Sequence, residues 1–137
     1  MATDRRPPFV SAIGLNHYNI RAPSPLLEEL RDFYCAMVGL RVGARPAFRS
    51  RGYWLYADDQ DVLHLTQTRA GEIREVGSVP TFDHVAFTCE NFEAMRAALT
   101  AAGIAYEIED VPLTGQRQIF FRDPTGNGIE LNFGSKA

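Results

Sequence analysis

Residues 15–20 read Leu-Asn-His-Tyr-Asn-Ile, and residues 82–87 read Phe-Asp-His-Val-Ala-Phe. Each stretch carries a histidine in third place, His17 and His84, among mostly alternating apolar and polar residues, as in a half-buried strand. The two stretches lie 67 residues apart, which indicates an internal repeat. We therefore interpret the chain as two copies of one structural unit.

A second pair of stretches extends this repeat. Residues 53–65 align without a gap with residues 119–131, at an offset of 66 residues. This alignment places His64 over Glu130, so both copies carry polar residues at matching strand positions.

The repeat divides the chain into two modules, at about 13–68 and 82–134. Residues 69–81 between them contain glycine and proline and few apolar residues, which is typical of a linker. One module alone buries little apolar surface. We therefore expect both modules to form a single domain over residues 1–137, with a core that they share or that a second chain completes.

Each module is expected to form a strand, a helix and then three strands. The first helix begins at Pro23-Ser24-Pro25 and ends near Val38, and the second runs from a capping Asn91 to about Ala102. The expected strands are at 15–21, 40–48, 51–57 and 61–68, and at 82–89, 104–110, 116–122 and 127–133. This order predicts an α+β fold of two paired βαβββ modules, with helices outside curved mixed sheets.

Composition excludes several classes of protein. The chain has 137 residues, of which 45% are hydrophobic and 23% charged, as in an ordinary globular domain. Lys and Arg number 14 against 17 Asp and Glu, so a nucleic-acid or anionic-membrane partner is not expected. No signal-peptide h-region and no apolar run of membrane-spanning length is present. Two cysteines form no disulfide framework, and we expect a cytoplasmic protein.

Four polar residues of the strands fall at repeat-related positions: His17, His64, His84 and Glu130. Because alternate residues of a strand share a face, each points away from the apolar residues beside it. A single strand histidine is more often packed or hydrogen-bonded than a ligand. Four such positions on modules that curl toward each other predict a divalent metal site, for Zn²⁺, Ni²⁺, Co²⁺, Mn²⁺ or Fe²⁺.

The sequence resembles the vicinal oxygen chelate superfamily, which includes glyoxalase I, extradiol dioxygenases, methylmalonyl-CoA epimerase and the bleomycin-resistance proteins. The resemblance covers about 12–134. The resemblance rests on four stretches: Leu-Asn-His17, the helix end Asp-Phe-Tyr-Cys-Ala-Met-Val-Gly-Leu at 32–40, Phe-Asp-His84, and Arg-Asp-Pro-Thr-Gly-Asn-Gly-Ile-Glu-Leu at 122–131.

The resemblance implies a metal-binding cup formed by the paired modules, and commonly a homodimer. It also implies that His17, His84 and Glu130 occupy the 2-His-1-carboxylate positions of the extradiol enzymes. His64 falls on a fourth position, which is typically Glu in glyoxalase I and Gln in the epimerase. Members of the family often build each site from both subunits of a dimer, and the linker at 69–81 permits either that arrangement or a site within one chain.

A full ligand set favours an enzyme over a small-molecule binding protein. We expect a glyoxalase-type lyase or isomerase that chelates vicinal oxygens of a small substrate and stabilises an enolate-like intermediate. Glu130 is the candidate catalytic proton carrier. A Fe²⁺-dependent extradiol-type ring-cleavage dioxygenase is the first alternative, and a bleomycin-resistance-like binding protein is the second.

Three polar residues are candidates for the substrate pocket: Asn19, Thr66 and Asn132 each lie two residues beyond a candidate ligand. They either bind substrate or face water. Arginines that could hold a substrate carboxylate are Arg49, Arg51 and Arg117. Aromatic residues at 53, 54, 56, 120 and 121 could line the cup, although alternation admits only about half of them. The acidic residues Asp58, Asp59 and Asp61 are expected to form a solvated turn.

Overall fold

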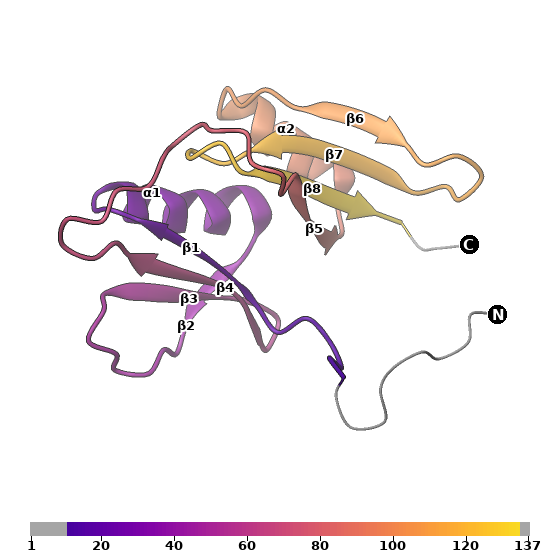
Figure 1. Ribbon diagram of the computed structural model, residues 1–137. Helices are drawn as coiled ribbons and strands as arrows, with labels where there is room; N and C mark the ends of the chain where they lie inside the picture. The colour runs from indigo at the N-terminus through magenta and orange to yellow at the C-terminus, as the bar shows by residue number, and fades with distance from the viewer. Residues whose placement is uncertain (1–10, 135–137) are drawn as a thin grey trace.

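The computed structural model describes residues 11–134. It contains two four-stranded sheets with the same strand order, together with their helices (Figure 1). The first module contains β1 (Tyr18–Ala22), α1 (Leu26–Phe33), η1 (Tyr34–Val38), β2 (Arg41–Gly43), β3 (Gly52–Ala57) and β4 (Gln60–Gln67). The second contains β5 (His84–Cys89), α2 (Phe92–Ala101), β6 (Glu107–Asp110), β7 (Arg117–Arg122) and β8 (Gly128–Phe133).

The strand orders are β1-β4-β3-β2 and β5-β8-β7-β6. In both sheets the first strand pairs in parallel with the last strand of its module, and the other pairs are antiparallel. The expected α+β fold of two βαβββ modules is therefore confirmed.

The first helix ends in a π-helical turn. Its buried residues Leu27, Leu30, Tyr34 and Val38 recur every three or four positions, which places one apolar side against the core. Gly39 follows with a φ of 86°, a left-handed conformation that glycine adopts without strain. The helix thus reaches Val38 as expected, with its last five residues wound as η1.

Two local expectations are wrong. The strand expected at 40–48 is only β2, because the chain turns where Pro46 lacks an N–H and its carbonyl accepts a hydrogen bond from the Phe48 amide at 2.8 Å. Asn91 precedes α2, but it has a φ of 69° and makes no side-chain capping bond. Its carbonyl oxygen instead accepts from the Met95 amide at 3.1 Å.

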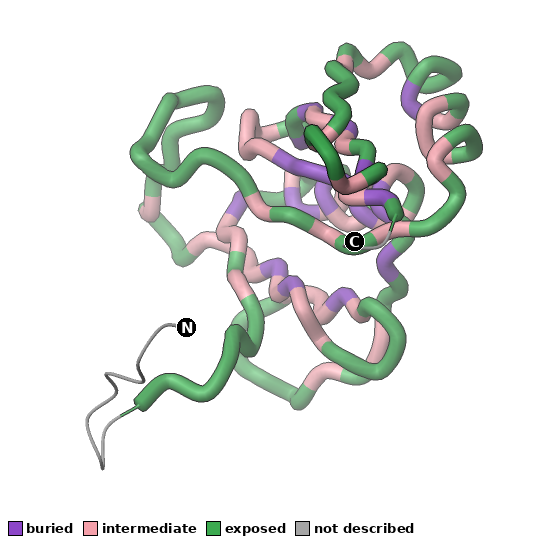
Figure 2. Tube along the Cα trace, turned by 90° about the vertical axis from the view of Figure 1, so that its right-hand side faces the viewer, coloured by how far each residue is buried: buried purple, intermediate pink, exposed green. Residues whose placement is uncertain are grey.

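Both sheets contribute to one hydrophobic core. Leu63 and Leu65 of β4 and Leu131 of β8 are fully buried in it. Figure 2 shows the buried positions gathered inside the molecule, with exposed loops around them.

Helix α1 and η1 connect the two modules. The ring of Phe33 lies 6.0 Å from that of Phe121 on β7. The Tyr34 hydroxyl donates a buried hydrogen bond of 2.7 Å to Asp123 Oδ2. These contacts fix how the two sheets sit relative to one another. No helix within residues 11–134 has the length and apolar character needed to cross a bilayer.

Candidate metal-binding site

Strand register places several candidate residues on one face of the first sheet. Asn19 of β1 and Trp54 of β3 are the cross-strand partners of His64 on β4. Cross-strand partners share a face, so these side chains lie opposite the buried Leu63 and Leu65. We call this surface the open face of the first sheet.

His17 and His64 stack on this open face. Their ring centroids are 3.7 Å apart and their planes are inclined by 16°. Trp54 stacks on His64 with a centroid distance of 4.2 Å and an interplanar angle of 7°. Beside them, Thr66 donates a hydrogen bond of 2.9 Å to Asn19 Oδ1.

The second sheet holds a histidine next to a buried carboxylate. His84 Nε2 lies 3.3 Å from Glu130 Oε1. Glu130 is only 7% exposed, and its Oε2 accepts a hydrogen bond of 2.9 Å from Asn132 Nδ2. The Oδ1 atom of Asn132 is buried and has no hydrogen-bond partner among the described residues. An unpaired buried acceptor of this kind indicates a place for an external donor.

The preceding residues orient His17 and His84 in the same way. Asn16 Oδ1 lies 2.7 Å from His17 Nδ1, and Asp83 Oδ2 lies 2.8 Å from His84 Nδ1. Both oxygens are acceptors, so each ring donates through Nδ1 and leaves Nε2 as the nitrogen for a ligand. This second hydrogen bond is the usual partner of a metal-ligating imidazole.

The spacing of His84 and Glu130 also fits a metal. A bare Nε2 and a carboxylate oxygen repel each other unless a proton or a cation lies between them. Two atoms bound to one zinc ion at a tetrahedral angle lie about 3.4 Å apart. The observed 3.3 Å is close to that separation.

His64 is oriented differently from the other two histidines. Its Nε2 lies 2.7 Å from Asp61 Oδ2. This hydrogen bond is the main reason that the pKa of Asp61 lies below its usual value, so Asp61 is ionised and accepts. The proton of His64 is therefore on Nε2. Asp61 was expected in a solvated turn, but it lies at the start of β4, and its contact with His64 was not evident from the sequence.

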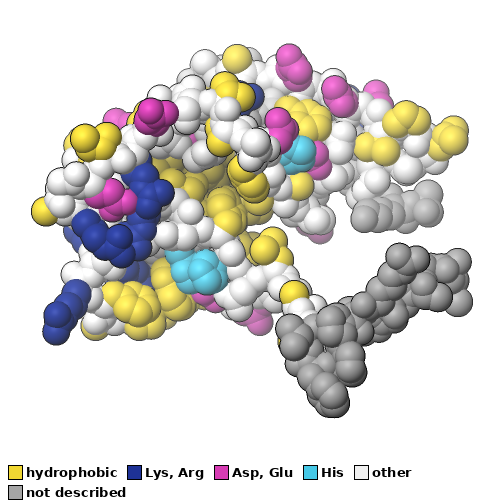
Figure 3. All heavy atoms as spheres, viewed as in Figure 1, with side chains coloured by type: hydrophobic (Ala, Val, Ile, Leu, Met, Phe, Trp, Pro, Cys, Tyr) yellow, Lys and Arg dark blue, Asp and Glu magenta, His cyan; other side chains and the backbone are white. Residues whose placement is uncertain are grey.

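The structure brings His17 together with His64, and His84 together with Glu130, but it does not bring the two pairs together. Within residues 11–134, no three His, Cys, Asp or Glu side chains of one chain lie close enough to hold a metal ion. Figure 3 shows the histidines as two separate patches on the two lobes of the molecule. Each module therefore carries two of the four expected ligands, and the two pairs lie apart.

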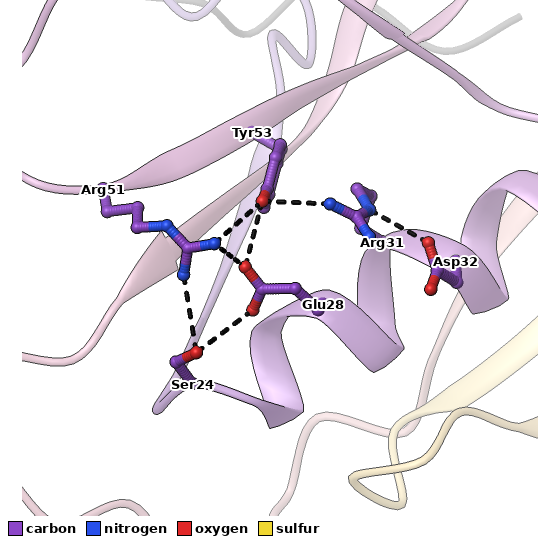
Figure 4. A network of polar contacts seen from close by, with 6 residues as sticks. All are labelled: Ser24, Glu28, Arg31, Asp32, Arg51 and Tyr53. Atoms are coloured by element: carbon purple, nitrogen blue, oxygen red, sulfur yellow. Dashed lines mark hydrogen bonds and ion pairs between the residues drawn. The ribbon is translucent and has the colours of Figure 1, made fainter.

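Two of the candidate arginines are committed to partners within the fold. Arg51 forms an ion pair with Glu28 and contacts the Tyr53 hydroxyl at 3.1 Å, in the network of Figure 4. Arg117 pairs with Asp110 at 3.1 Å and lies over the Phe92 ring. Arg49, by contrast, is exposed in a loop.

The register also settles which aromatic residues face the candidate ligands. Trp54 is paired with His64, and Phe120 is paired with Glu130, so both lie on the ligand faces. Tyr53 and Phe121 point the other way. A cavity of about 530 Å³ opens beside His84 and is lined by Phe120, Tyr106 and Arg122 among others.

The family model of the glyoxalase/bleomycin resistance protein/dioxygenase superfamily matches residues 14–131. A search of curated proteins gives no match.

Three solved structures illustrate the likeness. A glyoxalase family protein from Bacillus anthracis has a TM-score of 0.70 and 21% identity, covering 92% of this chain and 98% of its own. Lactoylglutathione lyase from Agrobacterium tumefaciens has a TM-score of 0.62 and 19% identity, covering 90% and 95%. TnmS3, an antibiotic-binding protein from Streptomyces, has a TM-score of 0.61 and 23% identity, covering 91% and 100%. At these identities the likeness shows the fold alone.

Proposed function

This chain belongs to the glyoxalase/bleomycin resistance protein/dioxygenase superfamily, and we propose that it is a divalent-metal-dependent enzyme acting on a small substrate with two adjacent oxygen atoms. The observation that carries the proposal is the contact between His84 Nε2 and the buried Glu130 Oε1 at 3.3 Å. A buried carboxylate beside an imidazole nitrogen is a suitable ligand pair for Zn²⁺, Fe²⁺ or a related ion.

His17, His84 and Glu130 hold the metal in this proposal. When bound, the metal supplies Lewis acidity toward two neighbouring oxygens of the substrate. Glu130 is the candidate proton carrier, because its Oε2 is positioned by Asn132. The hydrogen-bonded pair Asn19 and Thr66 lies on the face of His17 and His64.

The complete site is shared between two chains of a homodimer. The buried contacts of Tyr34 with Asp123 and of Phe33 with Phe121 hold the modules of one chain in place, so its two half-sites cannot close on each other without breaking the core. Strands β1 and β5 are both sheet edges.

Exposed apolar residues precede these two edges. Leu15 before β1 is 88% exposed, and Phe82 before β5 is 60% exposed. Pairing of β1 with β5 of the partner subunit covers these residues and places His17 beside His84 and Glu130 of the partner subunit.

The reaction that we propose is a glyoxalase-type isomerisation or lyase reaction. An extradiol-type ring-cleavage dioxygenase is the second candidate, and the hydrogen bond of His64 with Asp61 favours it. With His64 held in that way, two histidines and one carboxylate remain as ligands, which is the ligand set of many Fe²⁺ oxygenases. We place the protein in the cytoplasm, consistent with the free thiols of Cys35 and Cys89.

Metal analysis of the purified protein tests this proposal. We expect one divalent ion per chain, and loss of most of that binding in His84→Ala and Glu130→Gln. Turnover is then assayed with a glutathione hemithioacetal, and with catechols under oxygen. Oxygen consumption with Fe²⁺ selects the dioxygenase. Absence of metal and turnover, together with saturable ligand binding that survives loss of the histidines, rejects the enzyme in favour of a binding protein.

A further inference from the structure

We propose that His64 is not a ligand of the metal but a positioning residue that holds the ring of His17. Asp61 and Trp54 in turn fix His64. This inference rests on the proposed function, because it concerns the number of side chains that hold the proposed metal.

The first argument is which nitrogen of each ring is available. The Nδ1 atoms of His17 and His84 are occupied by Asn16 and Asp83, which leaves their Nε2 atoms free. In His64 the occupied atom is Nε2, through Asp61 at 2.7 Å. His64 would have to give up an ionised partner before its Nε2 could bind anything else.

The second argument is the angle between the rings. The lone pair of an imidazole nitrogen lies in the plane of the ring, so a metal bound to two imidazoles lies near both planes. Planes about 3.7 Å apart and inclined by 16° meet only roughly 13 Å away, whereas a zinc ion lies about 2 Å from its ligand nitrogen. In this arrangement His17 and His64 cannot bind the same ion.

The third argument is what holds His64 in place. Trp54 covers the other side of its ring at 4.2 Å and 7°, and its side chain is only 13% exposed. Rotation of His64 toward a metal would break two stacking contacts and the hydrogen bond with Asp61. Rotation is therefore disfavoured, and the flat surface of His64 limits how His17 can turn.

The consequence concerns the substrate class. Three protein side chains would leave coordination positions at a bound metal open for two adjacent oxygens of a substrate. A site of this kind would suit a small bidentate substrate, as in the proposed function.

Nitrogen-15 NMR of the imidazole rings tests the inference. The chain has only three histidines, so three single variants assign the spectrum. In the metal-free protein we expect the proton on Nδ1 in His17 and His84, and on Nε2 in His64. Addition of Zn²⁺ should shift the Nε2 resonances of His17 and His84 and leave the protonated Nε2 of His64 in place.

Two variants separate positioning from ligation. His64→Phe keeps a flat ring but has no nitrogen, and we expect its zinc affinity to stay within about threefold of the wild type. His64→Ala removes the ring, and we expect a loss of about 10- to 100-fold, the usual effect of removing a group that orients a ligand. Rescue by phenylalanine is a result that ligation by His64 would not give.

Two results would overturn the inference. One is a metal-free His64 with its proton on Nδ1. The other is a zinc-induced shift of a His64 nitrogen, accompanied by a loss of affinity in His64→Phe as large as in His84→Ala. Zinc that shifts none of the three histidines contradicts the proposed function instead, and the position of the His64 proton then still decides the role of Asp61.

Discussion

Replacing Tyr34 by phenylalanine removes the hydroxyl group that joins the two modules. The Tyr34 hydroxyl donates to Asp123 Oδ2 at 2.7 Å, and both residues are buried. A hydrogen bond to a charged group contributes about 1.5–3 kcal/mol. Asp123 keeps hydrogen bonds from Thr125 and Asn127. Because the carboxylate is not left unpaired, we expect the lower part of that range, about 1.5–2 kcal/mol of lost stability.

Urea denaturation followed by circular dichroism measures this loss, with all proteins at one concentration so that any dimerisation contributes equally. The matched control is Tyr56→Phe, because the Tyr56 hydroxyl donates to the Ala44 carbonyl at an exposed position. We expect the free energy of unfolding of that control to stay within about 0.5 kcal/mol of the wild-type value. If Tyr34→Phe is no less stable than Tyr56→Phe, the buried hydrogen bond does not hold the modules together. The two half-sites of one chain could then approach each other without a second chain.

Two further predictions concern a glycine and a thiol. A Cβ atom at Gly128 would lie 2.2 Å from the backbone oxygen of Asp83, so we expect Gly128→Ala to displace β8 from β5, to lower the urea midpoint of unfolding and to weaken metal binding. The control Gly14→Ala, which has open space around it, should have none of these effects. Equal urea midpoints for the two variants would contradict the close packing at Gly128. Partial burial raises the pKa of the Cys89 thiol to about 11. Because the thiolate is the reactive form, alkylation of Cys89 in a Cys35→Ser variant at pH 8 should be about 100-fold slower than alkylation of an exposed thiol, and its rate should rise about tenfold per pH unit. A rate equal to that of free cysteine would contradict the raised pKa.

The repeat made most of the fold predictable from the sequence. Alternation of apolar and polar residues identifies the strands, and proline and glycine mark the helix ends. The matching stretches around His17 and His84 then predict two modules with the same order of strands and helix. The expected strand at 40–48 was too long because an alternation pattern does not show where a backbone leaves its neighbour. The end of a strand depends on which backbone amides are hydrogen-bonded to the neighbouring strand, and Pro46 has no N–H to donate.

The candidate site was predictable only in part. Period-two alternation tells which residues share a face, and the register agrees for Asn19 and His64. It does not predict a hydrogen bond between two residues three apart in one strand, and the bond of Asp61 with His64 within β4 is of that kind.

The placement of the two half-sites was not predictable either. It depends on the contact between Tyr34 and Asp123, which lie 89 residues apart and follow no period in the sequence.

The measurement that tests the central claim most directly is the metal content of a mixed dimer made from one His17→Ala chain and one Glu130→Gln chain. If each site takes His17 from one chain and Glu130 from the other, one site of the mixed dimer carries both changes and the second carries neither. The account predicts one ion per mixed dimer, two per wild-type dimer, and almost none in either variant alone. A mixed dimer that binds no metal, while the wild type binds two ions, would contradict a site shared between chains.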